Sequence, residues 1–329
     1  MTSSARSRLD MTPSLSRLLP WTDRTGRATW PRVVVFALLW LPAMVLAGRW
    51  AAGDLGPRPL AEAIHVCGDW AVRLLLVAVA ITPLRHLSGS TRLIGVRRMI
   101  GLAALAYAAV HVVLWGADLG FAAPTLAFEI AVRPYLTLGF VAFAGLVAMG
   151  ATSSDAQVRR LGAERWRRLH RSVHPIVMLA LVHLFLQSKL DLGEGAVLTG
   201  LAGAGVALRV AIERRRLGAP AIAIAGGVAF ATAAAAEAIW FGLKTGRAVG
   251  PMLAANFDFA ARIAPSWIAA AITLAVAAGA FAVRHRGRRG DELAGPAAAE
   301  AGRRPSRTGE RAQRDGGEDH RRSGAPTSP

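Results

Sequence analysis

Three histidines stand within or beside long apolar stretches of the sequence, and their residue type favours metal ligation. His111 lies in AYAAVHVVLW, His183 in MLALVHLFLQ and His170 in RWRRLHRSVHP. An ionisable side chain at membrane depth is costly, so such a residue is a functional candidate by default. Two neutral imidazoles that face each other across a helical bundle form a ready axial pair for a b-type haem. On residue types alone, two unrelated core histidines bonded to backbone are the alternative.

The positions of these histidines along their segments predict that His111 and His183 lie at a similar depth in the membrane. If the third apolar segment begins near Met99, His111 lies about 18 Å along a helix that rises ~1.5 Å per residue. His183 lies about 20 Å beyond His170 on the same rise. The step from His170 to His183 rotates by about 220° on an ideal helix. Pro175 lies between them and can kink the helix, so the sequence leaves their relative facing open.

The elements that must position these histidines are membrane-spanning helices. The chain has 329 residues, 53% of them hydrophobic, and the apolar residues come in runs instead of alternating with polar faces. Eight segments approach the ~20 apolar residues of a span: 33–48, 70–87, 99–117, 134–151, 171–187, 195–212, 219–242 and 264–283. The sequence therefore predicts an all-α polytopic membrane protein with about eight transmembrane helices. Arg73, near the start of the second segment, is expected to snorkel to the interface.

The net charge is +18. The basic residues that produce it are distributed as a membrane topology requires, so they give no reason to expect nucleic acid as a partner. Most arginines before the tail fall in the N-terminal arm and in the loops after the second, fourth and sixth segments. By the positive-inside rule, this places both termini in the cytoplasm of a multi-pass inner-membrane protein. The N-terminal arm lacks a short apolar stretch that ends at a cleavage site, so no cleaved signal peptide is expected.

No motif of a soluble catalytic domain accompanies the histidines. The single cysteine, Cys67, permits no intrachain disulfide, no CxxC redox pair and no CxxCH haem attachment. The sequence contains no GxGxxG, P-loop or HExxH. The end of the chain is rich in Gly, Pro, Ser, Arg and Glu, which predicts a disordered tail able to lean on anionic lipid.

An ordered series of motifs covers about residues 55–212: HVCGDWAVRLLL with ITPLR, RRMIGLAALAYAAVH, RPYLTLG, and LGAERWRRLH followed by thirteen residues that end in His183. In this series the chain resembles the MsrQ (YedZ) type of haem-binding membrane subunit, within the ferric-reductase-like transmembrane superfamily. The resemblance implies a b-type cytochrome that takes electrons from the quinone pool. By the same resemblance, it is expected to pass them to a periplasmic molybdopterin methionine sulfoxide reductase, its heterodimeric partner, which repairs oxidised envelope proteins.

Carried over by motif, His111, His170 and His183 correspond to the haem-associated histidines of the family. His111 and His183 are the expected iron ligands of one haem, and His170 is a candidate ligand of a second. The related oxidase branch has another histidine about fourteen residues before the one on the third span, where this chain has Arg97. A second haem therefore lacks an obvious partner ligand, with His174 and His86 as weak candidates. A flavin mononucleotide (FMN) is also associated with the family, although no residue here identifies its site.

Three further residues are secondary candidates. His65 matches a histidine that relatives have at the mouth of the second span, where it would meet a partner protein, solvent or a haem propionate. Arg97 and Arg98 flank His170 in the predicted topology. They would neutralise propionates or guide a quinol headgroup or a soluble reductase, or would only set topology.

The expected organisation has four parts: a basic N-terminal arm at 1–32, a haem domain at 33–212, two additional transmembrane helices at 213–284 and a disordered tail at 285–329. Two other functions stay open. One is a stand-alone transmembrane metal-ion or quinone reductase of the same superfamily, which would ordinarily need a cytoplasmic flavin domain. The other is a cofactor-free transporter or assembly factor, whose polar residues should be scattered over several spans instead of clustering on two.

Overall fold

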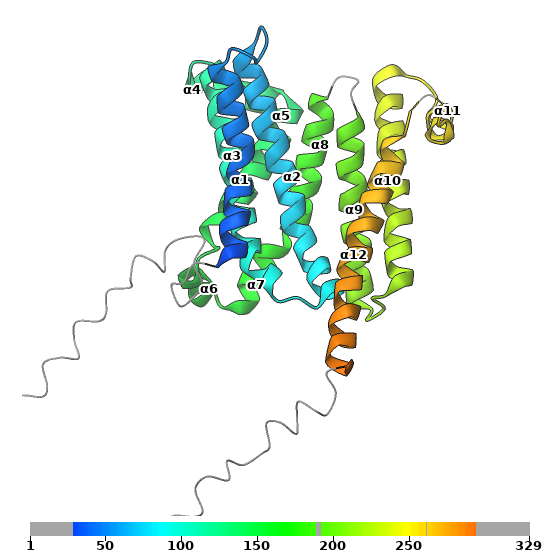
Figure 1. Ribbon diagram of the computed structural model, residues 1–329. Coiled ribbons are helices and arrows are strands. Elements are labelled where there is room, and N and C mark those ends of the chain that lie inside the picture. Colours follow the sequence, from blue (N-terminus) through cyan, green and yellow to red (C-terminus); the bar gives the residue numbers. More distant parts are fainter. Residues whose placement is uncertain (1–28, 189–191, 261, 294–329) are drawn as a thin grey trace, which may run out of the picture. The chain divides into compact units, whose positions relative to one another are not determined.

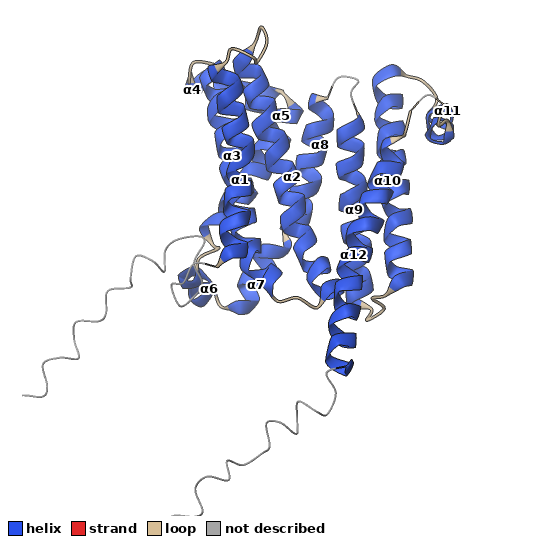
Figure 2. Cartoon of the chain, viewed as in Figure 1, coloured by secondary structure: helices blue, strands red, loops and turns tan. Residues whose placement is uncertain are grey.

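The computed structural model describes residues 29–188, 192–260 and 262–293, and within these ranges the chain is helical without strands (Figure 2). Eight helical stretches in them are long and apolar enough to cross a membrane. These are α1 (Trp30–Ala51), α2 (Pro59–Ser88), α3 (Arg92–Asp118), α5 (Pro134–Ala151), α7 (Ala163–Arg171) continued by α8 (Val173–Gln187), α9 (Gly193–Glu213), α10 (Ala219–Thr245) and α12 (Pro265–Leu293). The prediction of an all-α polytopic membrane protein with eight spans is confirmed. Most of the N-terminal arm and of the tail lies outside the described residues.

Short helices connect some of the spans. Along the chain, α4 (Ala123–Val132) follows α3, α6 (Asp155–Leu161) precedes α7, and α11 (Val249–Ala254) follows α10. Figure 1 shows α11 beside the end of α10. The chain divides into a compact unit, Met1–Arg284, and a second unit, His285–Pro329. The first unit contains α1 to α11 and most of α12. The end of this unit at which α2 and α9 finish is called the basic end, because arginines lie in the last turn of α2 and directly after α9.

The second span differs from its expected bounds. Pro59 occupies the first turn of α2, where its missing N–H costs nothing, so the helix begins eleven residues before the apolar run at 70. The motif HVCGDW is therefore helical, and the loop between α1 and α2 is short. At the other end Gly89, with φ +69°, ends α2 in the left-handed conformation that glycine adopts without strain.

A side chain from α3 completes the hydrogen bonding of α1 around its internal proline. Pro42 lies inside α1, where its ring crowds the preceding turn. The hydroxyl of Tyr107 enters this turn: it accepts a bond from the backbone N–H of Ala43 at 3.0 Å and donates to the carbonyl of Leu39 at 2.9 Å. Backbone groups in the membrane need such partners because no water is present.

The break between the two helices of the fifth span lies at Ser172, three residues before Pro175. The Ser172 hydroxyl donates to the carbonyl of Leu169 at 2.6 Å, and Val173 starts the next helix. Pro175 then falls in the first turn of α8, a position that tolerates proline. His170 and His183 therefore stand on different helices, so the rotation expected for one continuous helix does not apply to them.

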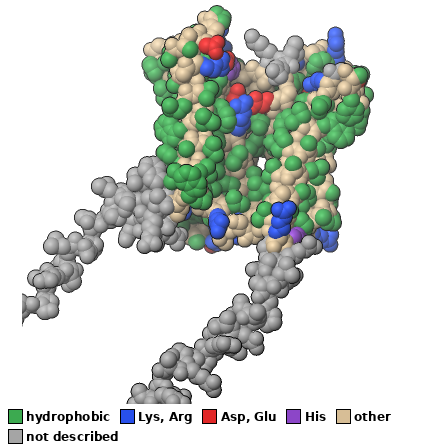
Figure 3. All heavy atoms as spheres, in the orientation of Figure 1, with side chains coloured by type: hydrophobic (Ala, Val, Ile, Leu, Met, Phe, Trp, Pro, Cys, Tyr) green, Lys and Arg blue, Asp and Glu red, His purple; other side chains and the backbone are tan. Residues whose placement is uncertain are grey.

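Two apolar clusters hold the unit together. The histidine-side cluster joins α2, α3, α5 and α8 and contains large residues such as Leu75, Ile100 and Leu181. The alanine cluster joins α9, α10 and α12 through Ala225, Ala229, Ala233 and Ala269, all fully buried. Hydrophobic side chains cover most of the face drawn in Figure 3, whereas its carboxylates gather towards the end opposite the basic end. This distribution suits helices that lie in lipid.

Candidate functional site

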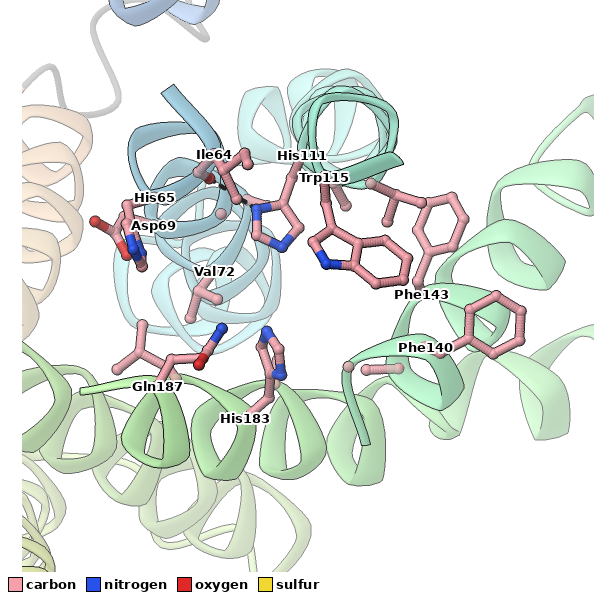
Figure 4. Close-up of a pocket in the computed structure, with 18 of the residues that line it drawn as sticks. Ile64, His65, Asp69, Val72, His111, Trp115, Phe140, Phe143, His183 and Gln187 are labelled. Atoms are coloured by element: carbon pink, nitrogen blue, oxygen red, sulfur yellow. Dashed lines mark hydrogen bonds between the residues drawn. The ribbon is translucent and has the colours of Figure 1, made fainter. Parts of the chain in front are cut away.

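His111 and His183 face each other across a cavity inside the histidine-side cluster. His111 comes from α3 and His183 from α8, and Figure 4 shows the two rings pointing towards one another from opposite sides. Their ring centres are 6.3 Å apart, and the ring planes are inclined at 86°. An imidazole–metal bond is roughly 2 Å long, so one metal ion bound by both rings requires ring centres about 6 Å apart. The observed separation matches that requirement.

The second nitrogen of each ring fixes the tautomer. His111 Nδ1 lies 2.7 Å from the carbonyl oxygen of Ile64, and His183 Nδ1 lies 2.7 Å from that of Tyr135. A carbonyl oxygen only accepts hydrogen bonds, so each Nδ1 carries the proton and donates it. Each Nε2 is then left with a free lone pair. This is the arrangement typical of histidine ligands, in which the outer bond both orients the ring and raises its basicity.

A glycine on the neighbouring helix makes room for each imidazole. A Cβ atom at Gly68 of α2 would lie 2.9 Å from His111 Nδ1, and one at Gly139 of α5 would lie 2.8 Å from His183 Nδ1. Such contacts are shorter than real Cβ atoms show, so any other residue would push the ring aside. The two glycines therefore belong to the site although they contribute no side chain.

The cavity between the rings has a volume of about 490 Å³ and mainly apolar walls. Trp115, Phe140 and Phe143 lie on one side of the histidine pair in Figure 4. Aliphatic side chains such as Val72 and Leu75 line another part of it. A flat aromatic ligand fits such walls, because aromatic and aliphatic side chains pack on its faces and exclude water.

The donor set tests whether a haem fits. No group of three or more His, Cys, Asp and Glu side chains within the described ranges is arranged to hold a metal ion, so a typical three- or four-ligand zinc site is not formed there. Two opposed imidazoles instead suit a metal whose remaining ligands come from a macrocycle, as in haem proteins. The residues present therefore fit an iron porphyrin.

Polar side chains line the other side of the cavity. His65, Asp69 and Gln187 lie together there in Figure 4, and Glu194 of α9 adds a further carboxylate to the lining. Glu194 accepts two bonds of 2.7 Å from Arg73 of α2, whose guanidinium also lies 5.0 Å from the centre of the Trp70 ring. Arg73 thus has a defined partner across the bundle instead of snorkelling alone. His65 is exposed at the cavity.

His170 does not line this cavity. It sits on α7, where its ring stacks on Trp166 at 4.1 Å between ring centres, and its Nε2 lies 3.3 Å from the hydroxyl oxygen of Thr152. That hydroxyl itself donates to the carbonyl of Ala148 at 2.8 Å. Trp166 Nε1 donates to the carbonyl of Thr152 at 3.0 Å. The structure therefore brings together His111 and His183, but places His170 in a separate group near the basic end.

The secondary candidates divide between the two ends. Arg97 is half-buried on α3 and lies within electrostatic range of His170, His174 and Arg209. Arg98 instead points outward and forms an exposed ion pair with Asp155 of α6. His65 alone of the secondary candidates lines the cavity of His111 and His183.

Several residues of the site were not identified from the sequence. Gly68, Asp69 and Glu194 line the cavity but were not predicted to belong to the site. Gly68 and the adjacent Asp69 could have been noticed, because a glycine and a carboxylate stand out beside an apolar run. Glu194 carried no such signal. The carbonyls of Ile64 and Tyr135 carried no signal, because every residue has one.

The fold and the cavity define a polytopic membrane protein with two opposed histidines inside its helical bundle. Residues 67–181 match the family model described as the ferric reductase like transmembrane component. This stretch includes α3 with His111 and most of α8, and it ends two residues before His183.

Relatives narrow the assignment further. The chain is 37% identical over 199 residues to a protein of Rhodospirillum rubrum, covering 60% of this chain and 93% of the relative. It is 41% identical over 163 residues to a protein of Caulobacter vibrioides, covering 48% and 78%. A protein of Xanthomonas campestris is 45% identical over 149 residues, covering 45% and 67%. Each is named protein-methionine-sulfoxide reductase heme-binding subunit MsrQ. The chain belongs to the MsrQ family, and no solved structure matches it significantly.

Proposed function

We propose that this chain is a membrane haem-binding subunit that transfers electrons, with His111 and His183 as the axial ligands of one b-type haem. The observation that carries the proposal is the pair of opposed rings, 6.3 Å between centres, with both Nδ1 atoms engaged by backbone carbonyls. The names of the relatives, each a heme-binding subunit, support the same cofactor.

The residues of the cavity have distinct tasks in this proposal. The carbonyls of Ile64 and Tyr135 accept a hydrogen bond from each Nδ1–H, so that each Nε2 keeps a lone pair for the iron. Gly68 and Gly139 leave space for the imidazole rings of His111 and His183, and the side chains of Trp115, Phe140 and Phe143 exclude water. When bound, the haem supplies reversible one-electron chemistry. Burial among apolar residues and the identity of the axial ligands are the means by which the chain would tune the reduction potential.

The proposed electron acceptor is a periplasmic molybdopterin-containing methionine sulfoxide reductase. The relatives' printed name makes each of them a subunit of a protein-methionine-sulfoxide reductase, which supports a catalytic partner for this chain. The ligand pair lies towards the outer ends of α3 and α8 in the proposed topology, close to where such a partner would dock. The consequence would be repair of oxidised methionines in envelope proteins.

The proposed electron donor is quinol from the inner membrane, with both chain termini in the cytoplasm. The arginine-rich loops at the basic end support this orientation. His170, beside Trp166 and Arg97, is the proposed site for a second redox group or for the donor. A flavin mononucleotide is part of the family-based proposal, and no side chain described here is assigned to it.

Stopped-flow reoxidation of the purified subunit tests this function. The haem is first reduced chemically, and its visible spectrum is then followed after mixing with the periplasmic reductase, with methionine sulfoxide, or with both. We expect fast reoxidation only with both. Fast reoxidation by methionine sulfoxide alone would make the chain itself the reductase. The absence of any Soret band from protein purified after haem-replete expression would instead favour a transporter or assembly factor.

A further inference from the structure

A second cavity, of about 490 Å³, lies at the basic end between α2, α9 and α12. Its lining includes three arginines, one from each of the segments that enclose it: Arg85 at the end of α2, Arg215 just after α9, and Arg284 on α12. His86 and Thr91 add further polar groups, and no carboxylate from residues 29–188, 192–260 or 262–293 lines the cavity. This cavity is separate from the one between His111 and His183.

Two features of the backbone involve the arginines of this cavity. Arg215 has φ +53°, a left-handed conformation that non-glycine residues rarely adopt. Its N–H donates to the carbonyl of Ile212 at 3.0 Å, which ends α9 in a tight turn. Arg284 Nη1 lies 3.4 Å from the carbonyl of His86 and tethers α12 to the end of α2. Strained residues persist where the surrounding structure fixes them, and they cluster at functional sites.

The three arginines have no acidic partner in the described part of the chain. Arg73, Arg98 and Arg262, by contrast, each form an ion pair there. Like charges that line one cavity repel each other. An anion that enters the cavity relieves this repulsion, and guanidinium groups match phosphate oxygens in a bidentate geometry. The lining chemistry therefore indicates a phosphate group as the ligand.

The place of the cavity indicates where that phosphate comes from. It lies at the ends of membrane-spanning helices. Val210 on α9 and Val283 on α12, close in sequence to the lining residues Ile212 and Arg284, expose apolar side chains. A phospholipid bound there can put its headgroup in the cavity and its acyl chains against such side chains. Basic pockets between helices at the cytoplasmic side of a membrane recognise anionic lipids in this way.

We propose that Arg85, Arg215 and Arg284 form a site for the phosphate of an anionic phospholipid. The lipid would join the end of α2 and α9 to α12. Because α12 lies beyond the stretch matched by the family model, the site would link the added helices to the haem-binding part of the unit. The proposal is independent of haem binding, since its residues do not line the histidine cavity.

Native mass spectrometry of the full chain, delipidated in neutral detergent at fixed ionic strength, tests the site. The protein is titrated with phosphatidylglycerol, with phosphatidylcholine, and with phosphatidylglycerol in the presence of inorganic phosphate. The variants are Arg215→Gln and Arg284→Gln. Arg216→Gln is the matched control, because Arg216 is exposed, adjacent to Arg215 and absent from the lining. Arg85→Gln replaces any variant that elutes as aggregate.

We expect tight retention of phosphatidylglycerol, but not of phosphatidylcholine, by the unmodified chain and by Arg216→Gln. Each lining variant should bind it roughly fivefold more weakly, the effect of one basic residue at an anionic lipid surface. Equal retention by Arg284→Gln and Arg216→Gln would overturn the site. Displacement of the lipid by equimolar inorganic phosphate would overturn the lipid as its source and leave a free-anion site.

Discussion

Glycine has opposite uses in the two apolar clusters of the unit. In the histidine-side cluster, Gly68 and Gly139 leave space that the imidazoles of His111 and His183 occupy. In the alanine cluster, Gly200 of α9 leaves space that other helices occupy. A Cβ atom there would lie 2.6 Å from the carbonyl oxygen of Ala229 and 2.7 Å from the Cβ of Ala269. The first use leaves room for two imidazole side chains, whereas the second brings helix backbones close together, as small residues do in membranes.

The largest expected effect follows from removal of a proposed iron ligand in the histidine-side cluster. His111→Ala and His183→Ala should each lose most of the bound haem, because the iron would keep only one axial ligand from the chain. Haem per protein, measured by the pyridine haemochrome assay, checks this. His285→Ala, which changes an exposed histidine beyond the compact unit, should keep the haem. Full haem content with an unchanged bis-histidine spectrum in either ligand variant would disprove the pairing.

The next largest effect is expected when the space that Gly68 and Gly139 leave beside the histidine rings is filled and the histidines themselves are kept. Gly139→Ala and Gly68→Ala should lower haem content several-fold or change the Soret position, since the new Cβ would displace a ring. Gly101→Ala on α3 is the matched control, because nothing lies within 4 Å of a Cβ at that position. If Gly139→Ala and Gly101→Ala gave the same spectrum and haem content, the role of Gly139 in leaving space for the imidazole would be wrong.

A smaller effect, of a different kind, is expected in the alanine cluster. Gly200→Ala forces α9 away from α10 and α12 and should cost about 1–3 kcal/mol of stability, while haem content per folded protein stays the same. Gly205→Ala, with open space around its Cβ, should stabilise α9 slightly. Thermal unfolding in detergent, followed by circular dichroism and by the Soret band, measures both. Loss of haem from folded Gly200→Ala would show that the two clusters are not separate.

The smallest effect is expected at Arg98, whose ion pair with Asp155 is exposed. Arg98→Gln should change stability by less than ~1 kcal/mol, as exposed pairs usually do. Topology is checked by a reporter fusion, and haem reduction is followed with a quinol. A much slower reduction with unchanged topology would give Arg98 the donor-guiding role that the sequence left open.

The sequence predicted the spans because long apolar runs have few alternatives. It placed the start of α2 too late, since Glu62, His65 and Asp69 interrupt the apolar pattern although the segment is helical from Pro59. It predicted a common depth for His111 and His183 from the rise per residue alone. It did not predict their facing, because the break at Ser172 that separates α7 from α8 depends on packing.

Long-range partners lay beyond sequence reasoning. Arg73 pairs with Glu194, which is 121 positions away, and neither residue indicates the other. The same holds for Arg284 of α12 and the carbonyl of His86, which are 198 positions apart. Such pairs arise only when the helices are assembled, and so the polar side of the histidine cavity and the basic cavity both required the structure.

Electron paramagnetic resonance of the oxidised, haem-loaded protein tests the central claim most directly. The ring planes of His111 and His183 are inclined at 86°, and nearly perpendicular imidazoles give ferric haem a low-spin signal of high anisotropy. We predict that signal in the unmodified chain, with its loss in both His111→Ala and His183→Ala. A high-spin signal in the unmodified chain, or the same low-spin signal in either variant, would contradict a haem held between these two residues.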